Sequence, residues 1–294
     1  MYFQNILKES KLMKKALCIL ANNMDYFKAL CKNLKQGDYD IIVCNETRIG
    51  NKVDKIKKIC PNAIVVDSED VVKDFATNVV DTEFLHTYTM GMKILIIWYV
   101  FKNFDYDKVF FTDEDVIINS IDRIFDYDKS AFYYFSLSAG NHAGLKANNE
   151  KYQKMIAEFN KIFGLDVNED NYKEMWIKKH INAGQRLYVR KDIKQFEKYL
   201  KKYFKSDYIK YIWDNRKRPT EMMLDEWFES MYILKTGIGT NALNKNHHVL
   251  LEIANPAKID FTKFNLKKWD MMHNATSSHK LEWLKLLKEY KQIK

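Results

Sequence analysis

The stretch "KVFFTDEDVIIN" (residues 108–119) decides the fold, because an apolar run with the composition of a buried strand leads directly into three acidic residues. These are Asp113, Glu114 and Asp115. Carboxylates next to an apolar core are costly unless a positive group pairs with them. Side chains two apart on an extended segment point the same way, so Asp113 and Asp115 are expected to converge while Glu114 faces elsewhere.

Two converging carboxylates repel each other unless a cation or a proton lies between them. A hard divalent cation suits the pair, because it prefers oxygen ligands and keeps positions open for phosphate. Such an ion would join the protein to a diphosphate and neutralise a leaving group. The alternative is a purely structural acidic strand end, and a D-x-D pattern by itself does not separate the two.

The segments on either side alternate between short apolar runs and amphipathic stretches. We expect strands at 15–22, 39–46, 62–69, 108–116, 130–139 and 247–254, and a turn that enters a strand within 180–191. We expect helices at 24–35, 51–60, 83–103, within 146–180, and at 194–204, 221–234 and 279–294. The β-α-β-α-β order of the first part predicts an α/β fold with a mostly parallel central sheet flanked by helices. Ligands of such sheets gather at the carboxyl ends of strands, which is where the acidic residues fall.

Composition narrows the class of protein. The chain has 294 residues and a net charge of +9, which suits a nucleotide, a nucleic acid or an anionic membrane, although composition alone favours the simpler explanation of a lysine-rich soluble surface. Its four cysteines contain no C-x-x-C pair, which favours free thiols in a reducing compartment over a zinc site. The N-terminus has no secretory hydrophobic region, and the longest apolar run, 94–101, is too short to span a bilayer. We therefore expect a cytoplasmic protein.

The acidic strand and its surroundings resemble a known family. A helix carrying Lys93, then the strand, then "VFFTDEDVIINSIDRIF" (109–125), is similar to the nucleotide-sugar glycosyltransferases of the glycosyltransferase-A fold. The likeness is strongest to the family of glycogenin and the bacterial lipopolysaccharide galactosyltransferases (glycosyltransferase family 8), whose pattern is "lyLDaDtlvl-x-dl-x-eLF". The resemblance implies a glycosyltransferase-A type fold, a Rossmann-like nucleotide-binding half, and Asp113 and Asp115 as ligands of Mn²⁺ or Mg²⁺. It also implies that Lys93, together with Asp113, lies near the donor diphosphate.

Two further motifs of the family concern the base and the sugar. "ANNMDY" (21–26) matches the segment that holds uracil, and keeps Asn23 and Tyr26 but has Ala21 where Thr is usual. An aromatic ring can stack on a base, and the alternative is that Tyr26 belongs to the core. In "HINAGQRLYV", Asn182 stands where the family has "FNSG" or "FNAG" beneath the sugar, and its amide can hydrogen-bond sugar hydroxyls.

The family's Asp-Gln pair at the start of a helix is matched by Asp225 and Glu226 in "TEMMLDEWFESMY" (220–232). The resemblance implies catalytic roles at the transferred sugar for this pair and for Asn182. Glu replaces Gln here, so a charge stands where the family has a neutral amide, and the role of Glu226 is left open. The alternative reading is that an Asp-Glu pair on a helix faces solvent.

Near the C-terminus the family has His-x-x-Gly-x-x-Lys-Pro-Trp, where His is the third metal ligand and Lys holds the β-phosphate. "HNATSSHKLEW" offers His273, Lys280 and Trp283, with the spacing from His to Lys one residue longer and without the Gly and Pro. His279 is a rival for either role. A histidine beside carboxylates suits manganese.

Together these matches cover most of 15–283. The resemblance implies one catalytic domain over 1–263, with a nucleotide-sugar half at about 15–135 and an acceptor half at 136–263, followed by a closing loop and basic helix at 264–294. It implies transfer of a hexose from a UDP-sugar to a hydroxyl of a glycan, lipid or protein acceptor, with retention of configuration.

Three other interpretations stay open. A metal-dependent nucleotidyltransferase shares the sheet and acidic strand end, although "LANNMDYFKAL" lacks the expected glycines. A nucleic-acid-binding protein fits the charge and the basic stretch 201–218, but the acidic residues would repel phosphate and no known motif is present, so nucleic acid is not expected as a partner. The C-terminal stretch 281–294 has the spacing of an interfacial helix, which makes peripheral membrane contact an alternative to the favoured interpretation that its apolar face packs on the domain.

Overall fold

The structure is a computed structural model. It describes residues 13–34, 37–47, 50–76, 89–134, 150–168, 181–207, 209, 224–239, 241–243, 249–251, 269–273 and 280–289. Its strands are β1 (Lys15–Ala21), β2 (Asp40–Asn45), β3 (Ile64–Asp67), β4 (Lys108–Thr112), β5 (Val116–Ile118), β6 (Ala131–Tyr134), β7 (Ile181–Val189), β8 (Asn241–Ala242), β9 (Val249–Leu251) and β10 (Met271–His273). Its helices are α1 (Met24–Asn33), α2 (Val53–Ile59), α3 (Ser68–Ala76), α5 (Thr89–Asn103), α6 (Asp122–Phe125), α7 (Glu150–Phe163), η4 (Arg190–Asp192), α9 (Ile193–Phe204), α11 (Leu224–Thr236) and α12 (Lys280–Glu289).

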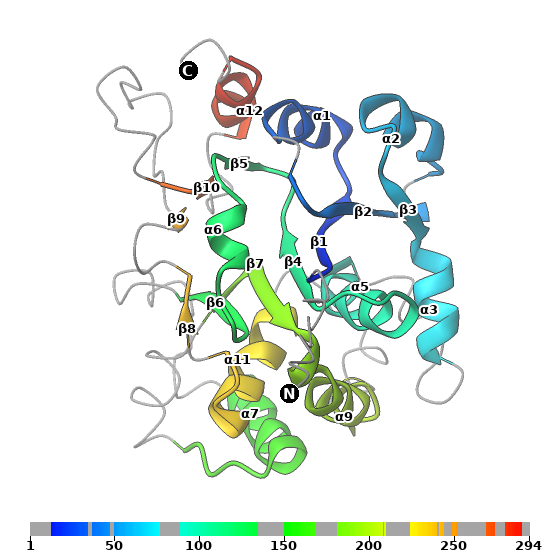
Figure 1. Ribbon diagram of the computed structural model, residues 1–294. Coiled ribbons are helices and arrows are strands. Elements are labelled where there is room, and N and C mark those ends of the chain that lie inside the picture. The colour runs from blue at the N-terminus through cyan, green and yellow to red at the C-terminus, as the bar shows by residue number, and fades with distance from the viewer. Residues whose placement is uncertain are drawn as a thin grey trace, which may run out of the picture.

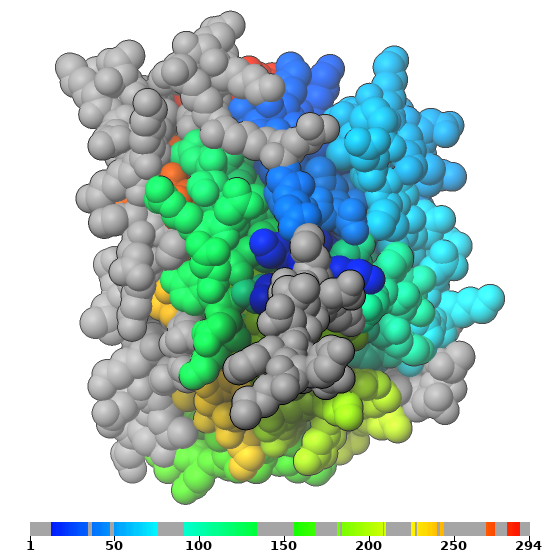
Figure 2. Space-filling view, viewed as in Figure 1, coloured from blue at the N-terminus to red at the C-terminus, as the bar shows by residue number. Residues whose placement is uncertain are grey.

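A seven-stranded sheet in the order β3-β2-β1-β4-β7-β6-β8 forms the centre of the molecule (Figure 1). The strands β3, β2, β1 and β4 are parallel, while β7 pairs antiparallel with both β4 and β6. The predicted α/β class with a mostly parallel sheet is therefore confirmed. In the space-filling view, α2 and α3 form the edge of the molecule next to β3 (Figure 2).

Both faces of the sheet are covered, which explains why β1 and β4 are apolar along almost their whole length. In β1, Leu17 and Ile19 point to the side that packs on α1, α2 and α6, while Cys18 and Leu20 point to the side under α3, α5, α9 and α11. This alternation is the period-two geometry of a strand. Because β1 and β4 pair in parallel, their carboxyl ends lie side by side, and the acidic residues follow β4 at that edge.

A second sheet, β5-β10-β9, begins immediately after the acidic residues. Its strands have three residues each, which is too short for a periodic pattern, and the sequence predicted neither β5 nor β10. The antiparallel register pairs Met272 with Ile117 and His273 with Val116. A segment more than 150 residues later in the chain is thus joined to the acidic turn.

Several boundaries differ from expectation. The acidic residues lie in a turn between β4 and β5, because β4 ends at Thr112. The helix α3 was not predicted; its first two residues, Ser68 and Glu69, were assigned to the preceding strand, and residues 70–76 to no element. The expected helix over 83–103 is described from Thr89 on, and most of the basic stretch 201–218 lies outside the described residues. Within the described chain, no helix is long and apolar enough to cross a bilayer.

Candidate active site

The acidic turn is held by β7 on one side. The backbone N–H of Asp113 donates to the carbonyl oxygen of Gly184 at 2.8 Å, which extends the β4–β7 pairing by one bond beyond the strand. The next residues then leave the sheet and enter β5. The turn therefore lies at the carboxyl end of β4, the edge where a parallel sheet takes its ligands.

Glu114 points away from the other two carboxylates, as predicted, and its partner is the start of α1. Its oxygens accept the backbone N–H groups of Asn22 at 2.9 Å and Asn23 at 2.6 Å. The N-terminus of a helix carries partial positive charge, so it suits an acidic group. Burial raises the pKa of Glu114 to about 8, the carboxylate of Asp115 adds to the rise, and the two N–H groups oppose it.

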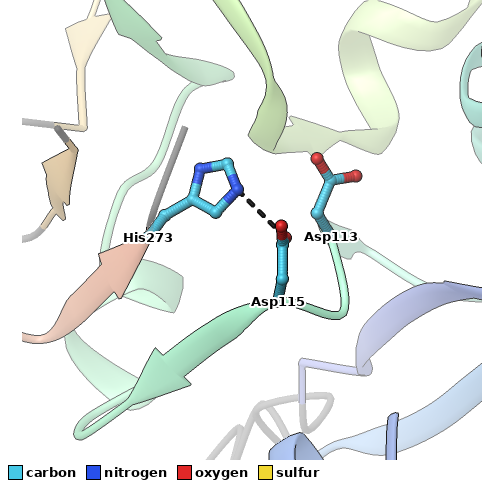
Figure 3. A group of neighbouring side chains, drawn as sticks. All are labelled: Asp113, Asp115 and His273. Carbon is cyan, nitrogen blue, oxygen red and sulfur yellow. Dashed lines mark hydrogen bonds and ion pairs between the residues drawn. The ribbon is translucent and has the colours of Figure 1, made fainter. Parts of the chain in front are cut away.

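Asp113, Asp115 and His273 converge on one point (Figure 3). One ligand atom from each lies within 4.8 Å of the other two, and Asp115 Oδ1 is 3.0 Å from His273 Nε2. Both aspartate side chains keep 21% of their surface exposed, whereas His273 is buried. Burial lowers the pKa of His273, but the Asp115 carboxylate outweighs it, and the net pKa is raised.

The space around these three residues fits a divalent cation. A Cβ on Gly184 would lie 2.7 Å from Asn182 Oδ1 and 2.8 Å from Asp113 Oδ2, so glycine alone leaves this space open. The buried Nδ1 of His273 has no hydrogen-bond partner among the described residues. Two carboxylates and an imidazole form a donor set that manganese and magnesium accept, with the nitrogen favouring manganese.

Lys93 comes from α5 and reaches the acidic turn. Its Nζ lies 2.7 Å from Asp113 Oδ1, so the ammonium group is directed into the site rather than out to solvent. Burial would lower the pKa of Lys93, but the carboxylates of Asp113 and Asp225 raise it. The lysine therefore supplies a fixed positive charge beside the converging carboxylates.

Asp225 and Glu226, at the start of α11, are buried with 3% and 8% of their surface exposed, so they are not a solvated pair. Asp225 Oδ2 lies 4.0 Å from the Arg186 guanidinium. Burial raises the pKa of Asp225 to about 6, although the charges of Lys93 and Arg186 lower it. Asn182, at the start of β7, uses its side-chain oxygen to accept the N–H of Gly184 at 2.8 Å.

The sequence reasoning missed a buried ion pair next to Asp225. Arg186 of β7 is fully buried, pairs with Glu229, and has its guanidinium carbon 4.6 Å from the centre of the Phe111 ring. Tyr188 donates its hydroxyl to Glu229 at 2.6 Å. Burial raises the pKa of Glu229 to about 7, against the lowering effect of Arg186. The available signal was a charged residue inside the apolar strand "INAGQRLYV" and two acidic residues four apart on α11.

The residues predicted at the base lie on α1. Asn23 is the N-cap, and its side-chain oxygen accepts the N–H of Asp25 at 2.9 Å and of Tyr26 at 3.4 Å. Tyr26 is 7% exposed, in a small core with Met272 and Trp283. Burial and the Asp115 carboxylate raise the pKa of its hydroxyl to about 12.

The two remaining predicted residues are less fully described. Lys280 is the first residue of α12, and its side chain lies outside the described part of the chain, as does all of His279. Of the two histidines considered as the third metal ligand, only His273 can therefore be compared with the prediction. His273 lies beside Asp115, where a third ligand was predicted.

No protein-family model and no curated protein matches this sequence, so the similar proteins found are all solved structures. The galactosyltransferase LgtC in complex with donor and acceptor sugar analogues has a TM-score of 0.47 and 13% identity, over 96% of this chain and 95% of that one. The glycosyltransferase GlyE of Streptococcus pneumoniae TIGR4 has a TM-score of 0.39 and 12% identity, over 96% of this chain and 64% of that one. Its apo form has a TM-score of 0.40 and 14% identity, over the same shares.

These solved proteins are glycosyltransferases, the class that the sequence motifs resemble. Because each of these TM-scores is below 0.5, we draw no conclusion from them about the donor, the acceptor or a metal. Those depend on the side chains around the acidic turn.

Proposed function

We propose that this protein is a metal-dependent glycosyltransferase that moves a hexose from a UDP-sugar to a hydroxyl of a glycan, lipid or protein acceptor, with retention. The convergence of Asp113, Asp115 and His273 at the carboxyl end of β4 carries the proposal. A diphosphate that binds together with a cation suits this site, because the cation would bind the carboxylates and the diphosphate would contact Lys93 directly.

In this proposal Asp113, Asp115 and His273 hold Mn²⁺ or Mg²⁺, which supplies positive charge to the donor diphosphate. Lys93 adds a fixed charge on the same side, where negative charge grows as the sugar departs. Lys280, at the start of α12, is proposed as a second positive group for the diphosphate.

The transferred sugar is proposed to lie between β7 and α11. Asn182 would donate from its amide nitrogen to a sugar hydroxyl, because its oxygen already accepts from Gly184. Asp225, as a carboxylate held near Lys93 and Arg186, would stabilise the positive charge that develops at the anomeric carbon. Glu226 follows Asp225 on α11 and is proposed to act at the same sugar, on the acceptor side.

The donor base is proposed to lie at the start of α1. Asn23 and Tyr26 stand at that helix N-terminus, next to the turn that holds Glu114. Retention follows from an acceptor hydroxyl attacking on the face of the sugar from which the diphosphate leaves.

A donor screen tests the proposal. UDP-glucose, UDP-galactose and the nucleoside triphosphates are each offered with Mn²⁺ and with EDTA, and UDP release, pyrophosphate release and thermal stability are recorded. We expect UDP release and a raised melting temperature with a UDP-sugar and Mn²⁺ together. Pyrophosphate release from a triphosphate would instead support the nucleotidyltransferase interpretation. NMR of the product's anomeric carbon decides between retention and inversion.

A further inference from the structure

One hydrogen bond joins the C-terminal helix to the acidic turn. The indole Nε1 of Trp283, on α12, donates to the backbone carbonyl oxygen of Asp115 at 2.7 Å. Trp283 is 1% exposed, so this bond is shielded from water. A buried carbonyl needs a donor, and the loss of that donor would leave the carbonyl unsatisfied and remove one of the constraints on the peptide group between Asp115 and Val116.

The indole ring packs against β10, which carries His273, and against β5, which directly follows Asp115. Trp283 belongs to a small core with Tyr26, Ala29, Ile117, Met272 and Leu287. Ile117 is two residues after Asp115 on β5, and Met272 directly precedes His273 on β10. Because Met272 and Ile117 are register partners, one side chain of α12 packs on the strand pair that brings Asp115 and His273 together.

The rest of α12 explains why the helix stays in this position. Trp283 and Leu287 are four residues apart and both buried, so they form one apolar stripe. The helix packs on α1, where the Asn33 side-chain amide donates to the carbonyl of Leu287 at 3.5 Å. The opposite side is solvated, with Leu281 81% exposed. The apolar stripe is therefore used within the domain.

We propose that Trp283 is a positioning residue that couples the docking of α12 to cation binding at Asp115 and His273. The inference rests on the proposed function, because it needs a cation at this site. Trp283 touches the carbonyl of Asp115 rather than the cation, so it acts by fixing the direction of that ligand. Coupling of this kind is reciprocal: if the docked helix strengthens cation binding, the bound cation must strengthen docking of the helix.

Calorimetric titration of the full chain with Mn²⁺ alone, and with Mn²⁺ in the presence of UDP, provides the first test. Trp283→Phe keeps a large ring in the core and removes the N–H. We expect it to weaken Mn²⁺ binding by about tenfold or more, the effect typical of groups that orient a metal ligand. Leu281→Ala, on the exposed side of the same helix, should bind Mn²⁺ like the wild type.

Leu287→Ala separates coupling from general stability. It removes packing from the same core but leaves the indole hydrogen bond, so it should lower the unfolding temperature more than Trp283→Phe and weaken Mn²⁺ binding less. Equal Mn²⁺ affinity of the Trp283→Phe variant and the wild type would overturn the coupling while leaving the proposed function intact. Failure of the wild type to bind Mn²⁺ under either condition would overturn both.

Hydrogen exchange of the wild type gives a second test that needs no variant. Saturating Mn²⁺ should slow amide exchange in α12 by several-fold relative to EDTA, and α9, whose buried side chains belong to a different core from that of Trp283, should show no change. If the wild type binds Mn²⁺ and exchange in α12 does not respond, the coupling is refuted.

Discussion

Two groups of charged side chains lie next to β4, and they are satisfied in different ways. The closed cluster consists of Arg186, Tyr188 and Glu229. The open cluster consists of Asp113, Asp115 and His273. In the closed cluster the guanidinium and the carboxylate are both fully buried and paired with each other. In the open cluster the carboxylates keep part of their surface exposed, and three ligand atoms still face a common point.

The difference separates a structural role from a binding role. In the closed cluster the charges of Arg186 and Glu229 balance each other inside the protein and no solvent-exposed group is offered to a ligand, although Nε and Nη2 of Arg186 have no hydrogen-bond partner among the described residues. Converging carboxylates with access to solvent can still bind a ligand, even though Lys93 and His273 partly balance their charge in this structure. Acidic content alone does not mark a site; the direction of the ligand atoms and their exposure do.

Replacing Arg186 with Met should produce the largest change in stability. The substitution leaves Glu229 buried without its cation, which costs about 3–5 kcal/mol in comparable buried pairs. Urea denaturation monitored by circular dichroism measures the free energy of unfolding. The double variant Arg186→Met with Glu229→Gln carries no charge in the cluster and keeps an acceptor for Tyr188, so it should recover most of the loss. If the single and double variants are equally stable, Arg186 does not compensate the buried charge of Glu229.

Asp115→Asn should affect the open cluster in the opposite manner, with a large loss of activity and little loss of stability. Removing a ligand charge should lower Mn²⁺-dependent turnover by at least about 100-fold, the upper end of what outer-shell partners of a metal ligand contribute. Coupled detection of UDP release with a UDP-sugar measures it. Asp128→Asn, at an exposed acidic residue away from the turn, is the matched control. Full activity of Asp115→Asn would remove the metal assignment.

The sequence was sufficient to predict those features of the fold and of the open cluster that depend on residues close together in the chain. The alternation of strands and helices along the first part of the chain, and the mostly parallel sheet, follow from alternating apolar and amphipathic runs, and Asp113 and Asp115 are marked by their spacing at a strand end. His273 was found through a motif resemblance, and the structure brings it to Asp115. Each of these depends on residues close together in the chain or on a pattern of known order.

The closed cluster was not predicted, for a physical reason. Arg186 and Glu229 are 43 residues apart, and whether they meet depends on how α11 crosses β7. A lone arginine in an apolar strand indicates a buried partner but does not say which carboxylate it is. The short strands β5 and β10 are also stabilised by tertiary pairing rather than by a local pattern, so the position of Trp283 could not be foreseen.

Tyr26 lies next to the open cluster, and its ring either stacks on the donor base or serves only to pack the core. If its ring stacks on the donor base, Tyr26→Ala should weaken UDP binding by about 1–3 kcal/mol, as base–aromatic stacking does elsewhere. If it is a core residue, the variant should lose stability and keep its affinity for UDP, because Tyr26 packs with Met272 and Trp283. Calorimetric titration with UDP and Mn²⁺, paired with thermal melts, distinguishes the two. Tyr26→Phe keeps the ring and should behave like the wild type in both measurements.

Asp225 lies between the two clusters and gives the smallest but most discriminating effect. It faces Lys93, the partner of Asp113, and also Arg186 of the closed cluster, while Glu226 and Asp113 repel it. Burial raises its pKa to about 6, so the side chain is ionised above that pH and neutral below it. If its charge stabilises the transferred sugar, turnover at saturating donor and Mn²⁺ should fall by about tenfold per pH unit below 6.

The contribution of Asp225 is isolated by Asp225→Asn, measured from pH 5 to 8. The variant should be slower throughout and should lack the decline below pH 6, because the amide does not titrate. Loss of the metal at low pH would mimic the decline, so Mn²⁺ occupancy is followed at each pH by the thermal shift of the same samples. An unchanged decline in Asp225→Asn would assign the titration to another group, His273 being the nearest candidate in the open cluster. Asp225 would then be grouped with Arg186 and Glu229 as part of the closed cluster.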